Sequence, residues 1–360
     1  MVKKTPLKGA NPRPAKSREA AKSQERAEEK PQQSREDFAW QQRILNVFSQ
    51  TFKEILFSDA FAATVQEVKQ ALFNRDFATA FGTEEYLEVY AARWSPTRAL
   101  CYEACLARIR LHLDELRKEK PMEAGEGSGA ASLRILSIGG GAAEIVAVGA
   151  FLSKIGASGD VNLLDSAAWG RVVSKLENGL TTPPVLPSYV SEAARTATRA
   201  IIEPSQFSAR FTENDILKLD EAQLRSIIGE SPLLVTLLFT LNELYTSGGL
   251  SNTTSFLLRL TAIVPAGSLL LVVDSPGSYS ETTVGKQERR YPMHWLLDKV
   301  LLATIDEPVE GRRWTKLESH ESIWFRLAES LNYPIPLENM RYQLHLYRAE
   351  LADVGTNAKT

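Results

Sequence analysis

The sequence has few of the residues that bind metals or form disulfides. Two cysteines occur in 360 residues, and both Cys101 and Cys105 fall on one predicted helix, where small buried side chains are expected. The four histidines are scattered without the spacing of metal ligands: His112, His294, His320 and His345. We therefore expect no metal and no disulfide framework, and the default environment is a reducing compartment.

Long apolar runs and a strong net charge are also lacking. No segment has the length and hydropathy of a membrane span, and the N-terminus lacks the apolar stretch of a secretory signal. The formal net charge is −2, so any contact with nucleic acid must come from a local patch. We expect an intracellular, monomeric protein with no membrane partner. At 44% hydrophobic residues, the chain can bury one large core with a helical annex.

Charge is unevenly distributed along the chain. Residues 1–36 contain ten Lys or Arg against five Glu and almost no large apolar residues, which predicts disorder. This basic tail is a candidate nuclear address or RNA tether, and the alternative is a solvated tail without a partner. We expect five regions: a disordered basic tail (1–38), a helical region (39–118), a linker (119–132), an α/β domain (133–350) and a flexible C-terminus (351–360).

Helical periodicity marks residues 39–118. Apolar side chains recur three or four positions apart, which is typical of amphipathic helices that need a partner surface. Pro96 predicts the first turn of a new helix. The two apolar stripes are Phe61, Val65, Val68 and Leu72, and then Leu106, Ile109, Leu113 and Leu116.

The most informative motif is LRILSIGGGAAE, at residues 133–144. A short apolar strand pattern ends in Gly139, Gly140 and Gly141, and a helix start follows. Glycine has no Cβ, so the backbone can approach a ribose or an amino-acid carboxylate, and the free amides of the helix point to the same place. Asp165 ends the next apolar run, 26 residues beyond Gly139, where an acid can accept hydrogen bonds from both ribose hydroxyls.

A third glycine is missing from this loop. Dinucleotide-binding folds prefer G-x-G-x-x-G, whereas Gly141 is followed by Ala142, Ala143 and Glu144. S-adenosylmethionine has a ribose and an amino-acid end but no phosphate, so it suits the shorter loop better than a dinucleotide does. We predict S-adenosylmethionine as the cofactor, and an NAD-linked dehydrogenase is a disfavoured alternative.

Apolar runs alternate with helical stretches after residue 132, which predicts a mostly parallel sheet covered by helices on both faces. The segment MRYQLHLYRAE alternates strictly, as an antiparallel edge strand does. Seven strands with an antiparallel end predict a Rossmann-like class I methyltransferase fold. The expected strands are 133–138, 161–164, about 209–212, 233–240, 268–274, then 323–326 or 332–335, and finally 341–348.

Polar residues follow the third and fourth predicted strands, at the sheet edge where ligands collect. Asn214 and Asp215 are expected to bind adenine, and an Asx turn is the alternative interpretation. Asn242 and Glu243 follow a fully apolar run and are expected where substrate meets cofactor, although Asn242 is also a candidate helix cap.

The fifth strand ends in a dense polar loop, VVDSPGSYSE, which contains Asp274, Ser275 and Tyr279. A plain turn is the alternative.

Two absences in the sequence limit which chemical group can accept the methyl group. No cysteine follows Cys105, which excludes a covalent thiolate route to a pyrimidine carbon within this domain. No Asn/Asp-Pro-Pro-aromatic tetrad follows the fourth strand, which disfavours an exocyclic adenine nitrogen; a ring nitrogen, a side-chain nitrogen or a hydroxyl remains.

Four longer strings resemble the fungal large-subunit ribosomal RNA uridine-N3 methyltransferases, and the similarity extends from about Phe73 to the C-terminus. They are YAARWSPTRALCY (90–102), FTLNEL (239–244), VVDSPGSYSE (272–281) and RYPMHWLLD (290–298). The resemblance implies a methyltransferase that uses S-adenosylmethionine on a uridine of large-subunit rRNA, free or in a pre-ribosomal particle. It implies a nuclear or nucleolar location, with the cytoplasm as a second one. A protein or small-molecule methyltransferase and a catalytically silent assembly factor are the alternatives.

This likeness places cofactor positions at Gly139, Gly141, Asp165 and Asp215. Ser137 departs from the pattern, because many relatives have an acid there. We therefore hypothesise that Arg93 or Arg98 supplies a charge partner for the methionine end.

For uridine N3, the imide proton must leave as the methyl group arrives, and a carboxylate would serve as base. Asp274 and Glu243 are the candidate bases, while Asn242, Ser275 and Tyr279 are expected to hold the carbonyl oxygens of the nucleobase.

RNA contact is expected where basic residues lie beside aromatic ones. Two such groups occur, although a tryptophan at helical spacing is also typical of a core. They are Arg289, Arg290 and Tyr291 before Trp295, and Arg312, Arg313 and Trp314 before Lys316.

Overall fold

The structure is a computed structural model, and it describes residues 34–118, 132–186, 189, 191–193, 198–277, 279–284 and 287–352. The side chains of residues 279–290 lie outside this description, as do nearly all of the expected tail and linker. The first helix begins at Arg35, inside the segment expected as tail, and the last strand ends at Leu351, just inside the expected C-terminal segment.

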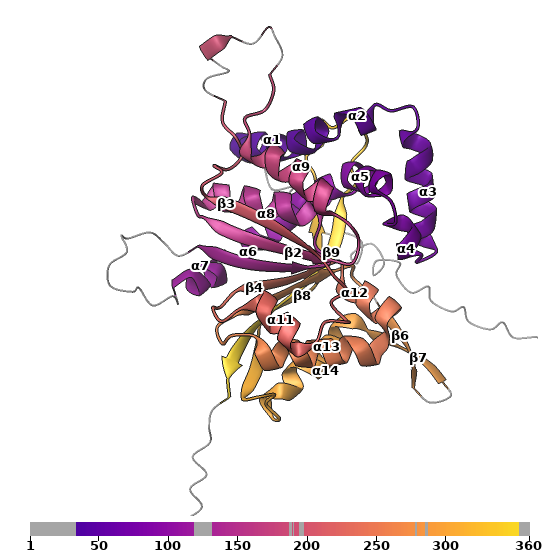
Figure 1. Cartoon of the computed structure of the whole chain (residues 1–360), viewed down its shortest axis with the longest axis vertical. Helices are drawn as coiled ribbons and strands as arrows, with labels where there is room; N and C mark the ends of the chain where they lie inside the picture. Colours follow the sequence, from indigo (N-terminus) through magenta and orange to yellow (C-terminus); the bar gives the residue numbers. More distant parts are fainter. Residues whose placement is uncertain are drawn as a thin grey trace, which may run out of the picture.

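Seven strands form one sheet in the order β3-β2-β1-β4-β5-β9-β8, with five parallel strands and two antiparallel ones (Figure 1). This arrangement confirms the expected Rossmann-like fold. Because β1 lies between β2 and β4, the chain reverses its direction of winding there, and ligands bind at such a point. The strands are β1 (Leu133–Ile138), β2 (Gly159–Asp165), β3 (Phe207–Glu213), β4 (Leu234–Leu238), β5 (Leu269–Asp274), β8 (Arg312–Phe325) and β9 (Met340–Leu351).

The next-to-last strand differs from the expectation. β8 begins at Arg312 and has 14 residues, whereas the alternative segment 332–335 has no strand. Its pairing with β9 shifts register between Lys316 and Glu318 and again between His320 and Ile323. These irregularities break the alternation of inward and outward side chains, so the sequence pattern of an exposed edge strand is obscured. A separate hairpin of β6 (Tyr279–Val284) and β7 (Gln287–Pro292) was also not expected.

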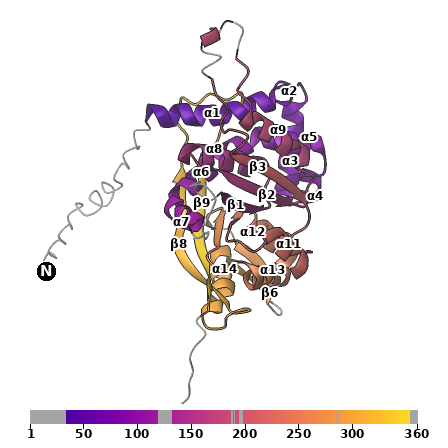
Figure 2. The same ribbon diagram turned by 60° about the vertical axis from the view of Figure 1, so that its left-hand side comes forward.

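The N-terminal helices pack on the sheet face that also carries α8 and α9, and Figures 1 and 2 both show them gathered there. Both predicted apolar stripes face this core, and the second one spans a break at Ile109 between two helices. The helices on this face are α1 (Arg35–Thr51), α2 (Lys53–Leu56), α3 (Phe61–Phe73), α4 (Phe77–Ala80), α5 (Glu84–Arg93), α6 (Ser95–Arg108), α7 (Arg110–Lys118), α8 (Ala142–Ile155) and α9 (Gly170–Thr181).

A second core covers the opposite face of the sheet. Trp314 lies in it with no exposed surface, and its indole N–H donates to Thr261 Oγ1 at 2.8 Å. The expectation that Trp314 stacks on RNA is therefore wrong, because this part of β8 is covered by helices. The elements of this face are α11 (Glu221–Ile228), α12 (Leu241–Glu243), a π-helical turn (Leu244–Gly248), α13 (Gly249–Ile263), α14 (Met293–Leu301) and a 3-10 turn (Leu302–Ile305).

The basic neighbours of Trp314 are occupied as well. Arg312 Nε donates to the Val264 carbonyl at 2.5 Å, and Lys316 pairs with Asp298 at 2.7 Å. Within the described ranges, no helix combines the length and the hydropathy of a membrane span, and no three His, Cys, Asp or Glu side chains lie close enough together to hold a metal ion.

Candidate active site

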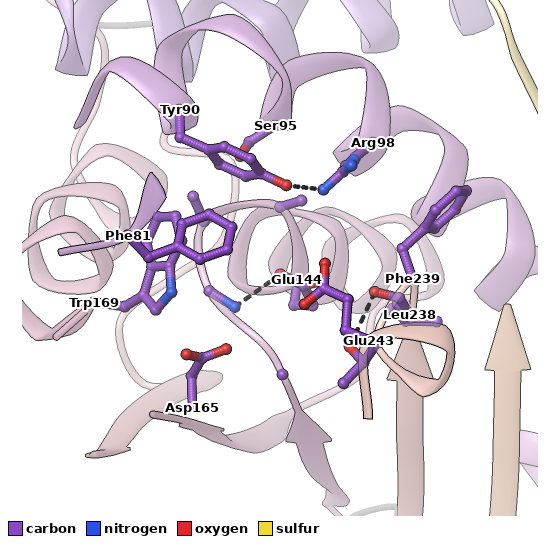
Figure 3. A pocket seen from close by; sticks show the side chains of 15 residues that line it. Phe81, Tyr90, Ser95, Arg98, Glu144, Asp165, Trp169, Leu238, Phe239 and Glu243 are labelled. Carbon is purple, nitrogen blue, oxygen red and sulfur yellow. Dashed lines mark hydrogen bonds between the residues drawn. The ribbon is translucent and has the colours of Figure 1, made fainter. Parts of the chain in front are cut away.

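Two adjoining cavities lie at the carboxyl ends of β1, β2 and β4. The outer cavity has a volume of about 600 Å³, and the inner one, drawn in Figure 3, about 50 Å³. The inner cavity is enclosed on one side by α5 and α6 of the N-terminal helices and on the other by the glycine loop. Five residues line both cavities, so the two form one site: Phe81, Gly139, Asp165, Thr240 and Glu243.

The glycine loop passes between two close side chains. Gly139 has a φ of 69°, and a Cβ there would come within 2.3 Å of the Thr240 side chain. A Cβ on Gly141 would lie 2.9 Å from the Trp169 ring. Gly140 is buried between them, and a Cβ on it would meet Ser137 Oγ at 2.5 Å. The loop therefore requires glycine to bring its backbone to the cavity wall.

Glu144 closes this loop from the first turn of α8. Its Oε2 accepts a hydrogen bond from the Gly141 amide at 2.8 Å, and the side chain lines the inner cavity (Figure 3). Burial raises the pKa of Glu144 to about 7. The carboxyl group thus satisfies one of the free amides of the helix start while remaining titratable near neutral pH.

Asp165 ends β2 and lines both cavities. Its Oδ1 accepts from the Ala167 amide at 2.7 Å, which fixes the turn after the strand. Burial raises the pKa of Asp165 to about 6. The Trp169 ring follows at the start of α9 and lies against Phe81 and Tyr90, with ring centroids 5.9 Å and 5.7 Å away.

Asn214 and Asp215 line the outer cavity after β3. The Asn214 amide donates to the Asp165 carbonyl at 2.8 Å, so the two strand ends are tied together. Asp215 Oδ1 accepts from the Leu217 amide at 3.0 Å, which is an Asx turn. The Asx turn expected from the sequence is therefore present, and both residues also face the outer cavity, where an adenine contact stays a prediction.

Arg98 of α6 reaches into the inner cavity (Figure 3). Its guanidinium donates to the Tyr90 hydroxyl and lies 5.3 Å from the ring centroids of both Tyr90 and Phe239. Phe239 has a φ of 59°, which bulky residues rarely adopt, and its amide donates to the Val273 carbonyl at 2.7 Å. The other hypothesised arginine, Arg93, points elsewhere and pairs with Glu338 at 2.6 Å.

Of the two candidate bases, Glu243 lines both cavities. It follows β4 on α12, and burial raises its pKa to about 7. Asp274 is 2% exposed and accepts two backbone hydrogen bonds, from the Asn242 amide at 3.1 Å and the Ser275 amide at 2.8 Å. Neither cavity is lined by Asp274, Asn242 or Ser275, as far as the described residues show its lining.

A protein-family model described as "Putative SAM-dependent methyltransferase" matches residues 48–348 of the chain. The chain belongs to this methyltransferase family. A curated relative from Saccharomyces cerevisiae (strain ATCC 204508 / S288c) is 31% identical in an alignment 334 positions long that covers 85% of each chain. That protein is named "25S rRNA (uridine(2843)-N(3))-methyltransferase".

Solved structures are more distant from this methyltransferase. One from Methanosarcina mazei, titled as SAM-dependent methyltransferases, is 12% identical, with a TM-score of 0.33 over 62% of this chain and 94% of that one. One from Clostridium acetobutylicum ATCC 824, titled as an S-adenosylmethionine-dependent methyltransferase, is 10% identical, with a TM-score of 0.32 over 70% and 99% of the two chains. Scores this low do not bear on function.

The cofactor of this methyltransferase is S-adenosylmethionine, and the donor set of the two cavities fits that molecule. The outer cavity offers Asp165 and Asp215, which can accept hydrogen bonds from hydroxyl and amino groups. The inner cavity offers the guanidinium of Arg98 beside bare glycine backbone, which suits a carboxylate. The outer end of the site thus offers hydrogen-bond acceptors, and the inner end combines the Arg98 donor with the carboxyl groups of Glu144 and Glu243.

Four residues that line the inner cavity were not predicted from the sequence as site residues: Phe81, Tyr90, Glu144 and Trp169. The position of Glu144 could have been predicted, because an acid three positions after a helix cap is typical of a capping box. Tyr90 and Arg98 both belong to the string that carries the family resemblance. No local pattern indicated that α5 and α6 lie over the glycine loop. Tyr279 and Arg290 lie on β6 and β7, and their side chains are outside the described residues.

Proposed function

We propose that this methyltransferase methylates N3 of a uridine in large-subunit ribosomal RNA. The observation that carries the proposal is the 31% identity to the yeast rRNA uridine-N3 methyltransferase, which extends over 85% of both chains. Identity over this length includes the N-terminal helices as well as the sheet, so the similarity is not limited to the cofactor-binding strands. The partner is large-subunit rRNA or a pre-ribosomal particle, and the location is the nucleus or nucleolus.

The two cavities divide the cofactor between them in this proposal. Asp165 accepts from the ribose hydroxyls, Asn214 and Asp215 contact the adenine, and the glycine loop with Arg98 holds the methionine end. When bound, S-adenosylmethionine supplies the methyl group. The packed rings of Phe81, Tyr90 and Trp169 exclude water from the inner cavity.

We assign the general base to Glu243. The proton on uridine N3 passes to this carboxylate as the methyl group arrives. A pKa of about 7 leaves the group largely ionised under mildly alkaline conditions and still basic enough to accept a proton. Asp274 acts as a positioning residue, because its carboxylate holds the backbone amide of Asn242, next to Glu243. Ser275, Tyr279 and Arg290 contact the nucleobase in this proposal.

The half-exposed pair of Tyr291 and Trp295 favours an RNA substrate. Their rings stack at 5.1 Å, and Lys299 lies 5.3 Å from the Trp295 centroid. A cation beside exposed aromatic rings can bind a phosphate while the ring contacts a base.

The deciding experiment is nucleoside mass spectrometry of large-subunit rRNA from cells with and without the protein. We expect 3-methyluridine to disappear at one position and to return with the wild-type chain but not with Glu243→Gln. Unchanged 3-methyluridine, together with methyl transfer to a polypeptide by the pure protein, would replace this proposal with a protein methyltransferase. A pure protein that binds no S-adenosylmethionine would instead be an assembly factor.

A further inference from the structure

An exposed aromatic side chain lies between two arginines at the far edge of the sheet. Trp324, near the end of β8, is 53% exposed. The guanidinium carbons of Arg326 and Arg341 lie 5.4 Å and 5.6 Å from the centroid of its ring. We call these three residues the Trp324 patch. The indole is therefore an open aromatic surface with a cation close to it on each side.

The patch lies toward the same end of the strands as the cavities, although on the edge strand β8 and its neighbour β9. Asp274, the last residue of β5, pairs with Gln343 of β9, and Arg341 precedes Gln343 by two residues in this antiparallel strand, past the end of β5. At a rise of about 3.4 Å per residue, Arg341 extends about 7 Å beyond the level of Asp274. Trp324 is the cross-strand partner of Arg341, so the two side chains leave the sheet on the same face.

Hydrogen bonds fix the strand that carries Arg341 to the loop after β5 and fix Arg341 itself to β8. Gln343 lies on the same face of β9 as Arg341 and donates through Nε2 to the Ser275 carbonyl at 2.7 Å. Arg341 Nε donates to Ser322 Oγ at 2.7 Å, which fixes the guanidinium against β8. The patch is therefore built on two paired strands and held in register with the strand ends that carry the site.

The charges of the patch are not neutralised. In the ranges that the structure describes, neither Arg326 nor Arg341 has an ion pair with a carboxylate, whereas Arg313 and Arg348 of the same two strands pair with Glu350 and Glu115. The ring orders both guanidinium groups by cation–π contact, and apart from the Arg341 Nε–H bonded to Ser322 their N–H groups are left for another acceptor. Two ordered guanidiniums suit phosphates, and guanidinium planes and indole faces are surfaces on which unpaired bases stack.

We infer that the Trp324 patch binds single-stranded RNA next to the target uridine. The inference rests on the proposed function and adds to it the surface that holds the flanking nucleotides. Phosphates contact Arg326 and Arg341, and an unpaired base stacks on the Trp324 indole or on a guanidinium plane. The chain has a net charge of −2, so RNA binding requires a local group of positive charges, and the two arginines of the patch provide one.

The test compares RNA binding by three variants of the full chain, using fluorescence anisotropy of a labelled, uridine-containing single-stranded RNA. Trp324→Ala should weaken binding about tenfold, because stacking contributes about 1–3 kcal/mol per base. The double variant Arg326→Glu/Arg341→Glu should weaken binding more than tenfold and lower the slope of log Kd against log salt by about 1.4, at about 0.7 for each phosphate contact. Trp324→Phe should retain most of the affinity.

The matched control is Arg210→Glu/Arg225→Glu, which changes net charge equally at exposed arginines on β3 and α11. Its RNA affinity and the S-adenosylmethionine affinity of all variants should stay within twofold of wild type. If Trp324→Ala and Arg326→Glu/Arg341→Glu bind RNA as tightly as the control does, the inference is overturned, and it is also overturned if the patch binds an acidic peptide in place of RNA. If these two variants form 3-methyluridine with the wild-type KM, the RNA-binding role of the patch is excluded while the proposed function stands. If RNA binding depends on the patch but no 3-methyluridine forms, the proposed function is excluded while the RNA-binding role of the patch stands.

Discussion

Arg98 on α6 donates a hydrogen bond to the hydroxyl of Tyr90 on α5, and the guanidinium lies 5.3 Å from the centroid of the Tyr90 ring. Both residues come from the N-terminal helices, and both line the inner cavity with the glycine loop. These helices therefore complete the site and are not a separate appendage. The N-terminal helices supply the Arg98 guanidinium, which would face the carboxylate of the cofactor. The strand ends of the sheet supply Asp165 and the bare backbone of the glycine loop.

The first prediction concerns this arginine. Arg98→Gln should weaken S-adenosylmethionine binding tenfold or more, because a hydrogen bond to a charged group contributes about 1.5–3 kcal/mol. Calorimetry should show no such loss for methylthioadenosine, which lacks the amino-acid end. Arg93→Gln is the matched control, since Arg93 pairs with Glu338 outside the cavity. Equal losses for both ligands would mean that Arg98 acts only on the fold of the cavity.

The second prediction separates backbone strain from steric fit in the glycine loop. Gly139→Ala should abolish cofactor binding and lower the free energy of unfolding by about 2–3 kcal/mol, because its Cβ would overlap the Thr240 side chain. Gly156 has a similar φ of 65°, but no atom lies within 4 Å of a Cβ placed there. Gly156→Ala should therefore lower the free energy of unfolding by about 1 kcal/mol and leave cofactor binding intact. Chemical denaturation and calorimetry measure both quantities. Similar effects of the two variants would contradict this assignment.

The third prediction distinguishes the two carboxylates near the substrate side. Glu243→Gln should lower the single-turnover methylation rate by about 10²–10⁴ and remove a rise in rate with pH centred near 7. Asp274→Asn keeps that pH profile but loses one of two backbone hydrogen bonds, so it should mainly raise KM for RNA. A normal profile in Glu243→Gln would exclude it as the base.

The fourth prediction is a pH dependence of stability in the cofactor-free chain. Burial raises the pKa of Glu243 from 4.5 to about 7, so the folded state binds more protons than the unfolded state between these values. Stability from this group is therefore present below pH 4.5 and is lost as the pH rises through 7, by an amount on the order of 3 kcal/mol. His345 acts oppositely, because burial lowers its pKa from 6.5 to about 4.

The measurement is the free energy of unfolding of wild type and Glu243→Gln at pH 5 and pH 8. The difference between the two proteins isolates the carboxyl group from His345. We expect Glu243→Gln to be the more stable of the two at pH 8 and the gap to close at pH 5. A gap that is independent of pH would show that the Glu243 pKa is close to its ordinary value.

The parallel strands and the glycine loop were predictable from the sequence, since both leave local patterns. Apolar runs such as residues 133–138 reflect burial on both faces, and three successive glycines mark a turn that tolerates no Cβ. The expected segment 323–326 covers only the end of β8, and the start of the strand at Arg312 was missed because two register shifts disturb the alternation of side chains. Trp314 illustrates the same limit: basic residues beside an aromatic one look alike in sequence, whether the ring is buried as in Trp314 or exposed as in Trp324.

The sequence by itself determined the order of the strands along the chain, the bend after β1 and the acid that ends β2, because each depends on a few adjacent residues. Only the tertiary structure decided which distant groups meet in the site. In the folded chain, Arg98 and Tyr90 lie beside the glycine loop, and Glu243 rather than Asp274 is the carboxylate that faces the cavities. Trp324 is exposed between its two arginines. Packing of helices against a sheet depends on complementary surfaces, which no local spacing of residues records.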